Sequence, residues 1–181
     1  MAAEVTPDSL EVCIVTHPWI ASKDTGVGNE RYAYELVRHL RRKGCTVKVL
    51  DSGPHSPSRL KAILKEADAF GKSVRAKAQV YHAICPNGAR NLLMLGKKPM
   101  VTTIHDMIPF RQGQFEARMV NEYRRFCTSL SARKSDMVVV PFAMTKEELV
   151  SRLGVRPEKI EVTVTRPGLV ARGTPVPSKR G

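Results

Sequence analysis

Short apolar runs alternate with amphipathic helical segments along almost the whole of this chain. The clearest run lies in Met100–Phe110, MVTTIHDMIPF, where the apolar and β-branched residues Val101–Ile104 follow Pro99. Such a run is typical of a strand buried on both faces, as in a parallel sheet. Similar runs predict strands at 11–16, 46–50, 79–83, 136–140 and 160–164. Because strands and helices alternate, the sequence predicts an α/β fold with a doubly wound, mainly parallel sheet.

The segments between these strands have helical periodicity. Helices are predicted at 29–43, 58–77, 88–95, 115–135 and 145–153. Ser58 is a suitable N-cap for the second helix, whose apolar residues we expect to face inward: Leu60, Ile63, Leu64, Ala67, Phe70 and Val74. Thr145 and Glu148 have the spacing of a capping box for the last helix, which Gly154 ends.

Length and composition indicate one soluble globular domain. The 181 residues are divided into a polar leader (1–10), a domain (11–165) and a Pro- and Gly-rich linker or disordered tail (166–181). The N-terminus lacks the pattern of a signal peptide, and no apolar run approaches the roughly 20 residues of a membrane-spanning helix. Four scattered cysteines without a C-x-x-C pair favour reduced thiols and a cytoplasmic protein.

The chain is strongly basic, with 30 Lys and Arg against 17 Asp and Glu and a formal net charge of +13. This excess favours anionic partners: nucleic acid, anionic lipid or a phosphorylated substrate. One Trp and an aromatic content of 6% make a single-strand nucleic-acid binder the least favoured of these. Basic residues on exposed helix faces are more often simply solvated, so the charge alone does not choose a partner.

Two loops carry candidate site residues. His105 and Asp106 directly follow a predicted strand, and ligands of open α/β sheets bind beyond the carboxyl ends of the strands. In the simpler alternative, Asp106 caps the turn and His105 is a packing histidine. The second loop, 25–28 (TGVG), precedes a helix and is either an anion-binding turn or a turn without a ligand.

Taken together, the motifs resemble the N-terminal half of a GT-B glycosyltransferase of the family 4 type, also called glycosyltransferase group 1. TGVGNERYAYELVRHLRRKGCTVKVL looks like the Gly-rich loop, first helix and second strand of that family. VYHAICPNGARNLLMLGKKPMVTTIHDMIPF is similar to its third and fourth strands with the T-x-H-D motif. SDMVVVPFAMTKEELVSRLGVRPEKIEVTVTRPGL looks like its later strand, helix and final strand. The resemblance covers residues 10–169 and implies a Rossmann-like domain.

The resemblance also implies roles for individual residues. Gly26, Val27 and Gly28 would lie against the diphosphate of a nucleotide-sugar donor. His105 would hydrogen-bond the donor sugar, and Asp106 would orient that histidine and its loop. The acceptor side would be lined by Asn29, Pro86 and Asn87. The family generally needs no divalent metal, so we expect no cofactor beyond the donor substrate.

Three departures from the family pattern limit this interpretation. Thr25 stands where the family usually has a glycine, and the segment 141–143 (PFA) replaces a Ser-bearing turn. The C-terminal domain, with its basic pair and Glu-x₇-Glu element, is absent from the sequence.

We therefore expect the acceptor-side half of a retaining glycosyltransferase, inactive without a C-terminal domain in the same or a second chain. Its acceptor would be a sugar, a phosphorylated molecule or a lipid-linked one, and the enzyme would be cytoplasmic or peripheral on the cytoplasmic face of a membrane. The alternative is a non-enzymatic basic Rossmann-like module that binds a phosphorylated ligand or nucleic acid. The donor sugar and its nucleotide stay open.

Overall fold

The structure, a computed structural model, describes residues 10–16, 28–51, 59–111 and 118–163. Its six strands form one parallel sheet in the order β2-β1-β3-β4-β5-β6. The strands are β1 (Glu11–Thr16), β2 (Thr46–Asp51), β3 (Val80–Ala83), β4 (Met100–Thr103), β5 (Met137–Val140) and β6 (Ile160–Val162). The predicted α/β, Rossmann-like parallel fold is therefore confirmed, with strand ends within two residues of the predicted ones.

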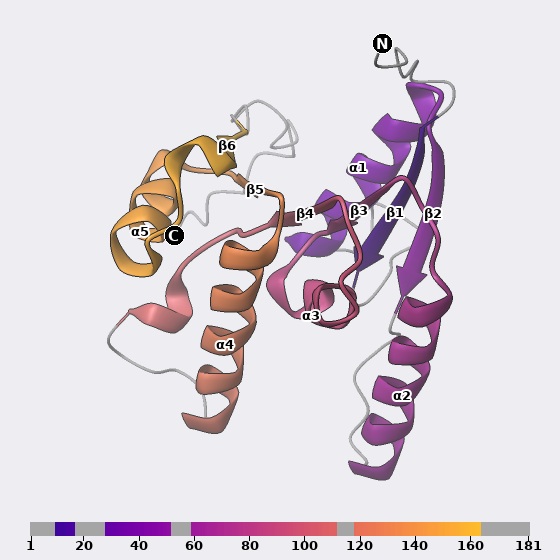
Figure 1. Cartoon of the computed structure of the whole chain (residues 1–181), viewed down its shortest axis with the longest axis horizontal. Helices are drawn as coiled ribbons and strands as arrows, with labels where there is room; N and C mark the ends of the chain where they lie inside the picture. The colour runs from indigo at the N-terminus through magenta and orange to yellow at the C-terminus, as the bar shows by residue number, and fades with distance from the viewer. Residues whose placement is uncertain (1–9, 17–27, 52–58, 112–117, 164–181) are drawn as a thin grey trace, which may run out of the picture.

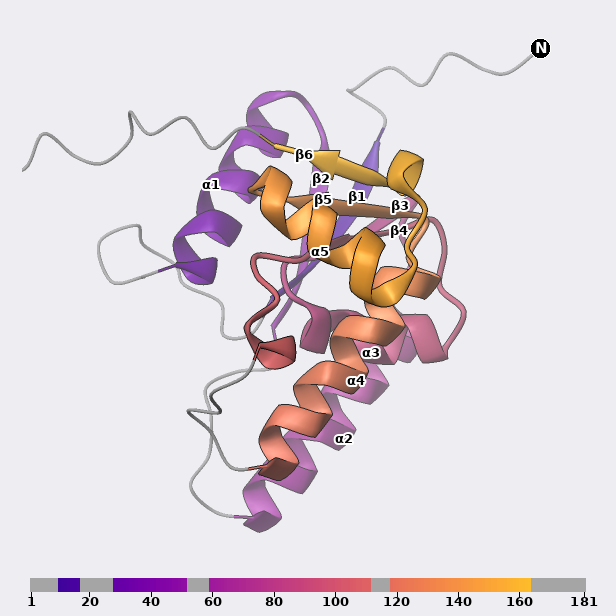
Figure 2. The same cartoon turned by 90° about the vertical axis from the view of Figure 1, so that its left-hand side faces the viewer.

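Helices cover the sheet on both faces (Figure 1). They are α1 (Asn29–Arg42), α2 (Arg59–Arg75), α3 (Pro86–Met94), α4 (Arg118–Lys134) and α5 (Ala143–Leu153), with the 3₁₀ turns η2 (Ile108–Phe110) and η3 (Pro157–Lys159). Figure 2 shows α1 on one side of the strands and α2, α3 and α4 on the other. This arrangement follows from right-handed crossovers, because the step from β1 to β2 runs in the opposite direction to the later steps.

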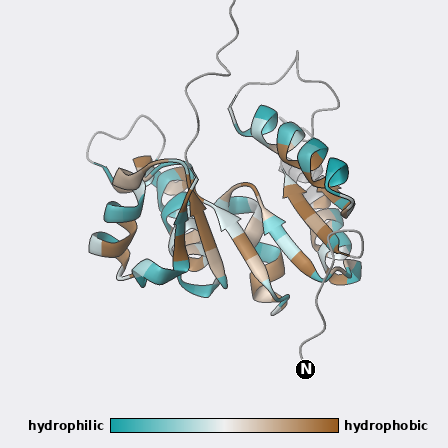
Figure 3. Ribbon diagram, turned by 90° about the horizontal axis from the view of Figure 1, so that it is seen from above, coloured by the Kyte–Doolittle hydropathy of each residue, from teal (hydrophilic) through white to brown (hydrophobic). Residues whose placement is uncertain are grey.

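The core consists of apolar residues that the strands turn toward these helices. Ile14 of β1 packs with Val37 of α1, whereas Leu92 of α3 lies with the residues of β1 and β3 on the opposite face. Near the other end of the sheet, Val138 of β5 packs with Leu149 of α5. Figure 3 shows strands with brown, apolar stretches between helices whose ribbons carry much teal, the colour of polar residues. Three of the four cysteines are buried, and no two of them are joined in a disulfide.

The expectation that the apolar residues of α2 face inward is wrong for every one whose side chain is described. Leu64, Phe70 and Val74 are 61%, 42% and 47% exposed, and Ala67 is also exposed. The physical reason is position: α2 extends past the end of the sheet, where little of the molecule is close enough to cover it (Figure 1). The Ser58 cap and the side chains of Leu60 and Ile63 lie outside the described residues.

Two helix starts also differ from the prediction. The capping box at Thr145 is wrong, because α5 begins at Ala143 and the Thr145 N–H donates within the helix to the Phe142 carbonyl (3.1 Å). Glu148 instead accepts hydrogen bonds from Arg111 of the η2 loop (3.0 Å). The helix α3 begins at Pro86 rather than Gly88, since proline is well suited to a first helical position.

Candidate functional site

A cavity of about 320 Å³ opens at the carboxyl edge of the sheet. It is lined by Asn29, Cys85, Pro86, Asn87, His105, Asp106, Ile108, Pro109, Arg124 and Thr128. These residues come from five separate places: the start of α1, the start of α3, the loop after β4, η2 and α4. Five of the predicted site residues thus lie together, although they are separated by up to 77 positions in the chain. The size is that of a site for a small ligand.

The cavity is located where the direction of the chain across the sheet reverses. β1 is paired with β2 on one side and β3 on the other, so the connections that follow β1 and β3 diverge and leave a crevice. The helix α3 approaches this crevice closely. A Cβ on Gly88 would be 3.3 Å from Cγ1 of Val15, so the glycine permits tight packing of α3 against β1.

His105 is held in one orientation at the rim of the cavity. Its Nε2 lies 3.0 Å from the carbonyl oxygen of Ile84, at the end of β3. A carbonyl only accepts hydrogen bonds, so Nε2 carries the proton and Nδ1 is left with a lone pair that can accept one. The Tyr32 ring of α1 packs edge-on against the imidazole, with 5.2 Å between the ring centroids. Burial lowers the pKa of His105, which keeps the ring neutral at physiological pH.

A second histidine, His82 of β3, lies behind this position and was not predicted. Its Nε2 is 2.8 Å from Oγ1 of Thr103, which is also 3.2 Å from the hydroxyl of Tyr32. Burial, and then the nearby His105, lower the pKa of His82 to about 4. The alternation of β3 could have placed His82 on the same face as α1, but the partner Thr103 comes from another strand and needs the register of the sheet.

Asp106 fixes the loop rather than the histidine. Its Oδ1 accepts a hydrogen bond from the backbone N–H of Ile108 (2.9 Å), which is the turn-capping role of the simpler alternative. The carboxylate acts on His105 only through its charge, which slightly favours the protonated ring. Its catalytic role remains a prediction.

Arg124 and Thr128 of α4 also line the cavity and were not predicted as site residues. The sequence predicts that this segment is a helix, but helical periodicity does not say which turn of α4 passes the cavity. The neighbouring Arg125 is engaged with the loop, since its guanidinium donates to the Pro109 carbonyl and lies 5.9 Å from the Phe110 ring centroid. Cys85, just before α3, completes the wall next to Pro86.

The glycine loop can be followed only in part. Gly26 and Val27 lie outside the described residues, and so does Thr25. Gly28 is described and is the N-cap of α1, with φ of 62° and ψ of −118°, a conformation that favours glycine. It directly precedes Asn29, which lines the cavity. The start of α1 is therefore next to the cavity, as the site prediction requires.

Within the described ranges, no group of three His, Cys, Asp or Glu side chains could hold a metal ion. In that same part of the chain, none of the helices is both long and apolar enough to cross a membrane.

Comparison with known proteins gives one family. The sequence model of Glycosyltransferase Family 4 matches residues 27–163. The fold is similar to that of Anabaena Alr3699/HepE in complex with UDP and glucose, at 13% identity and a TM-score of 0.51, over 84% of this chain and 44% of that one. For HepE in complex with UDP the identity is 13%, the TM-score 0.46 and the coverage 84% and 43%. The chain spans less than half the length of these proteins. No curated protein matches it.

Proposed function

Because the chain belongs to Glycosyltransferase Family 4, we propose that it is the acceptor-side N-terminal domain of a retaining glycosyltransferase. Such an enzyme would move a sugar from a nucleotide-sugar to an acceptor. The observation that carries the proposal is the gathering of Asn29, Asn87 and His105 around one cavity at the carboxyl edge. The crystallised HepE holds UDP and glucose, which supports UDP-glucose as the first donor to test.

The chemistry of His105 supports this assignment. The neutral ring donates through Nε2 to Ile84, and its Nδ1 lone pair is suited to accept a hydrogen bond from a hydroxyl of the donor sugar. The hydrogen bond to Ile84 and the Tyr32 contact keep the ring in place before the substrate arrives, so binding does not have to order it. Asn29 and Asn87 supply amide groups that can both donate to and accept from the hydroxyls of an acceptor.

A second domain is needed for catalysis in this proposal. Departure of a nucleoside diphosphate requires cations where negative charge develops. The start of α1 offers a helix N-terminus, which stabilises an exposed anion by about 0.3–1 kcal/mol. A rate enhancement of 10⁶ needs about 8 kcal/mol, so an open half-site does not suffice. A C-terminal domain, in the same or a second chain, would add cations and exclude water.

The test is an assay of sugar transfer from UDP-glucose in which the release of UDP is measured. Residues 1–181 alone should release UDP no faster than buffer, and a protein that also contains the second domain should be active. UDP release by the isolated chain at an enzymatic rate, lost in His105→Ala, would show that the second domain is not needed. Release by neither protein with UDP-glucose or any other nucleotide-sugar would count against the proposed function itself.

We also propose that α2 and α4 attach the enzyme to the cytoplasmic face of an anionic membrane, where a lipid-linked acceptor would be found. Both helices extend beyond the carboxyl edge of the sheet, the edge that bears the cavity (Figure 1). Both helices expose large apolar side chains: Leu64, Phe70 and Val74 on α2, and Met119, Val120, Tyr123 and Phe126 on α4. Exposed cations accompany them, among them Lys72 and Arg118. Apolar residues next to cations are typical of interfacial helices.

Vesicle binding tests the membrane proposal. Binding should rise with the fraction of phosphatidylserine and fall with salt, because each cation near the surface contributes about 1 kcal/mol before screening. The double variant Met119→Ser/Phe126→Ser should lose most of the binding. Met94→Ser serves as a control, since Met94 is 67% exposed at the end of α3. Equal binding to neutral and anionic vesicles would contradict the proposal without affecting the glycosyltransferase assignment.

A further inference from the structure

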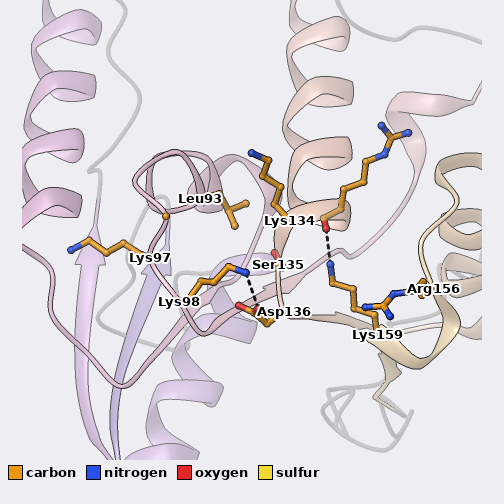
Figure 4. Close-up of a pocket in the computed structure, with 10 residues that line it drawn as sticks. Leu93, Lys97, Lys98, Lys134, Ser135, Asp136, Arg156 and Lys159 are labelled. Carbon is orange, nitrogen blue, oxygen red and sulfur yellow. Dashed lines mark hydrogen bonds and ion pairs between the residues drawn. The ribbon is translucent and has the colours of Figure 1, made fainter.

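A second cavity, of about 470 Å³, lies at the amino edge of the sheet, opposite the site described above (Figure 4). It is bordered by the segments that lead into β4, β5 and β6 and by the end of α4. Its lining residues include one carboxylate, Asp136, and six cationic side chains: Lys97, Lys98, Arg133, Lys134, Arg156 and Lys159. The glycosyltransferase assignment makes no use of this edge.

The cations reach the cavity from separate segments of the chain. Arg133 and Lys134 end α4, Lys98 precedes β4, and Arg156 and Lys159 flank and end η3. Figure 4 shows Lys98, Lys134, Lys159 and Arg156 arranged around one opening, with Lys97 directed away from it. Lys97 has a structural role instead, since its ammonium donates to the carbonyls of Val74 (3.1 Å) and Ala76 (2.9 Å) at the end of α2. The other five cations border the cavity; among them Lys98 is paired with Asp136 (3.3 Å) and Arg156 with Glu158 (3.5 Å), both in exposed ion pairs.

Helix dipoles account for only part of this cluster. Cations in the last turn of α4 are favoured by the carbonyl groups there, and Lys159 donates to the Arg133 carbonyl (2.7 Å). Lys98 and Arg156 lie outside any α-helix and have no such reason to converge. Their paired acids do not neutralise the cluster, because Asp136 alone faces the cavity, bonded to Lys98 (3.3 Å) and to the Met100 N–H (2.8 Å).

The cluster is electrostatically unfavourable as it stands. Partial burial lowers the pKa of Lys159, and the charges of Arg156 and Lys98 lower it further, against the opposing effect of Asp136. Like charges held close together repel one another, and an anion between them would reverse this repulsion. Its binding would thus be favoured by the arrangement of side chains that the fold already holds in place.

We propose that this cavity binds a compact ligand with two or more phosphate groups. Lys and Arg side chains are the usual partners of phosphate oxygens, and five of them exceed what a single phosphate requires. The lining contains no aromatic ring and only one large apolar side chain, Leu93, so it offers no surface on which a nucleobase could stack. Recognition is therefore of the phosphates and not of a nucleoside.

The probe is pyrophosphate, and its binding to the full chain is measured by calorimetry at two salt concentrations. The variant Lys134→Gln/Arg156→Gln removes two exposed cations. The ion pair of Arg156 with Glu158 (3.5 Å) is also exposed, so we expect the variant to fold normally. It should weaken binding about tenfold, because two of the cations that would pair with phosphate oxygens are lost. Higher salt should weaken binding to the unaltered chain.

The control is Arg42→Gln/Lys43→Gln, which removes the same charge from the end of α1 on the other face of the sheet. It should change the affinity less than twofold. Equal weakening in both variants would mean that only the net charge of the protein matters, and would overturn the proposal. Amide NMR gives a second measurement: pyrophosphate should shift the resonances of Lys98, Ser135 and Arg156. Shifts confined to residues near Gly28 and Asn87 would place the anion at the carboxyl edge and also overturn it.

Discussion

The two edges of one sheet in this protein suit anions by different physical means. At the carboxyl edge, α1 and α3 begin, so backbone N–H groups and the positive ends of helix dipoles are directed at the cavity around His105. At the amino edge, α4 ends, and its carbonyl groups would repel an anion unless side chains reversed the local field. The cluster that contains Lys98, Arg156 and Lys159 provides this reversal. In a parallel α/β domain, cationic side chains are thus needed most for anion binding at the amino edge, where the helices end and the backbone repels an anion.

The largest effect is expected from the loss of His105 in an enzyme that includes the second domain. His105→Ala should lower kcat by about 10²–10⁴-fold, the range for removal of a positioned polar group that acts on the reacting sugar. The unfolding midpoint in urea should change little, since His105 lies at the rim of the cavity. His105→Gln, whose amide nitrogen takes the position of the imidazole Nε2 and can still donate to Ile84, should retain more activity. Wild-type kcat in the alanine variant would remove His105 from the mechanism.

The next largest effect is the pH dependence of stability caused by His82, a neutral histidine beneath the carboxyl-edge site. The amino edge, in contrast, carries charged side chains. The folded-state pKa of His82 is about 4 against 6.5 ordinarily, so the unfolded chain binds a proton first as the pH falls. Neutral His82 therefore leaves the free energy of unfolding unaffected by pH above pH 6.5. As the pH falls toward 4, the free energy of unfolding decreases by up to about 3 kcal/mol.

The measurement is urea unfolding from pH 7.5 to 4, with the wild type compared with His82→Gln, whose amide can still bond Thr103. The variant should lose less stability over this range than the wild type. The pKa of His105 is lowered as well, so part of the slope should remain in the variant. Identical slopes in the two proteins would mean that His82 titrates normally in the folded state.

A smaller effect tests whether backbone geometry shapes the carboxyl edge. Gly28→Ala should destabilise the protein by about 1–2 kcal/mol, because φ of 62° is unfavourable for a residue with a Cβ. Gly71→Ala within α2 is the matched control and should stabilise by up to about 1 kcal/mol, since its Cβ would meet only the flexible end of Arg75. Thermal unfolding of the two variants gives the comparison. A neutral Gly28→Ala would show that the helix start is not constrained.

The smallest effect is expected from Asp136→Asn at the amino edge. Hydrogen bonds from Met100 and Lys98 outweigh burial and lower the pKa of Asp136, so its stabilising effect is present above pH 4 and lost at more acidic pH. The exposed pair with Lys98 contributes less than about 1 kcal/mol. The variant should be slightly less stable at pH 7 and should bind pyrophosphate more tightly, because the one acid in the cavity is gone. Weaker pyrophosphate binding would mean that Asp136 organises the cations rather than opposing the anion.

Local patterns in the sequence determined the elements and the edge at which site residues lie. The apolar run before His105 predicted a buried strand, and the alternation of strands and helices predicted a parallel sheet. Since the carboxyl ends of parallel strands meet at one edge, the order of elements predicted that His105 lies at the same edge as the loop before α1, whereas Asn87 was assigned to the site only through the family resemblance. These features depend on periodicity of two or 3.6 residues, which neighbouring residues suffice to define.

Only the tertiary structure decided which side chains meet across elements and which helix faces stay uncovered. The apolar face of α2 has the pattern of a core helix, yet Leu64 and Phe70 are exposed because α2 extends beyond the sheet that would have buried them. The contacts of His82 with Thr103, and of Lys98 with Asp136, join strands and loops through the register of the sheet. Register and helix placement are set by packing over distances far longer than a sequence motif, so no local pattern contains them.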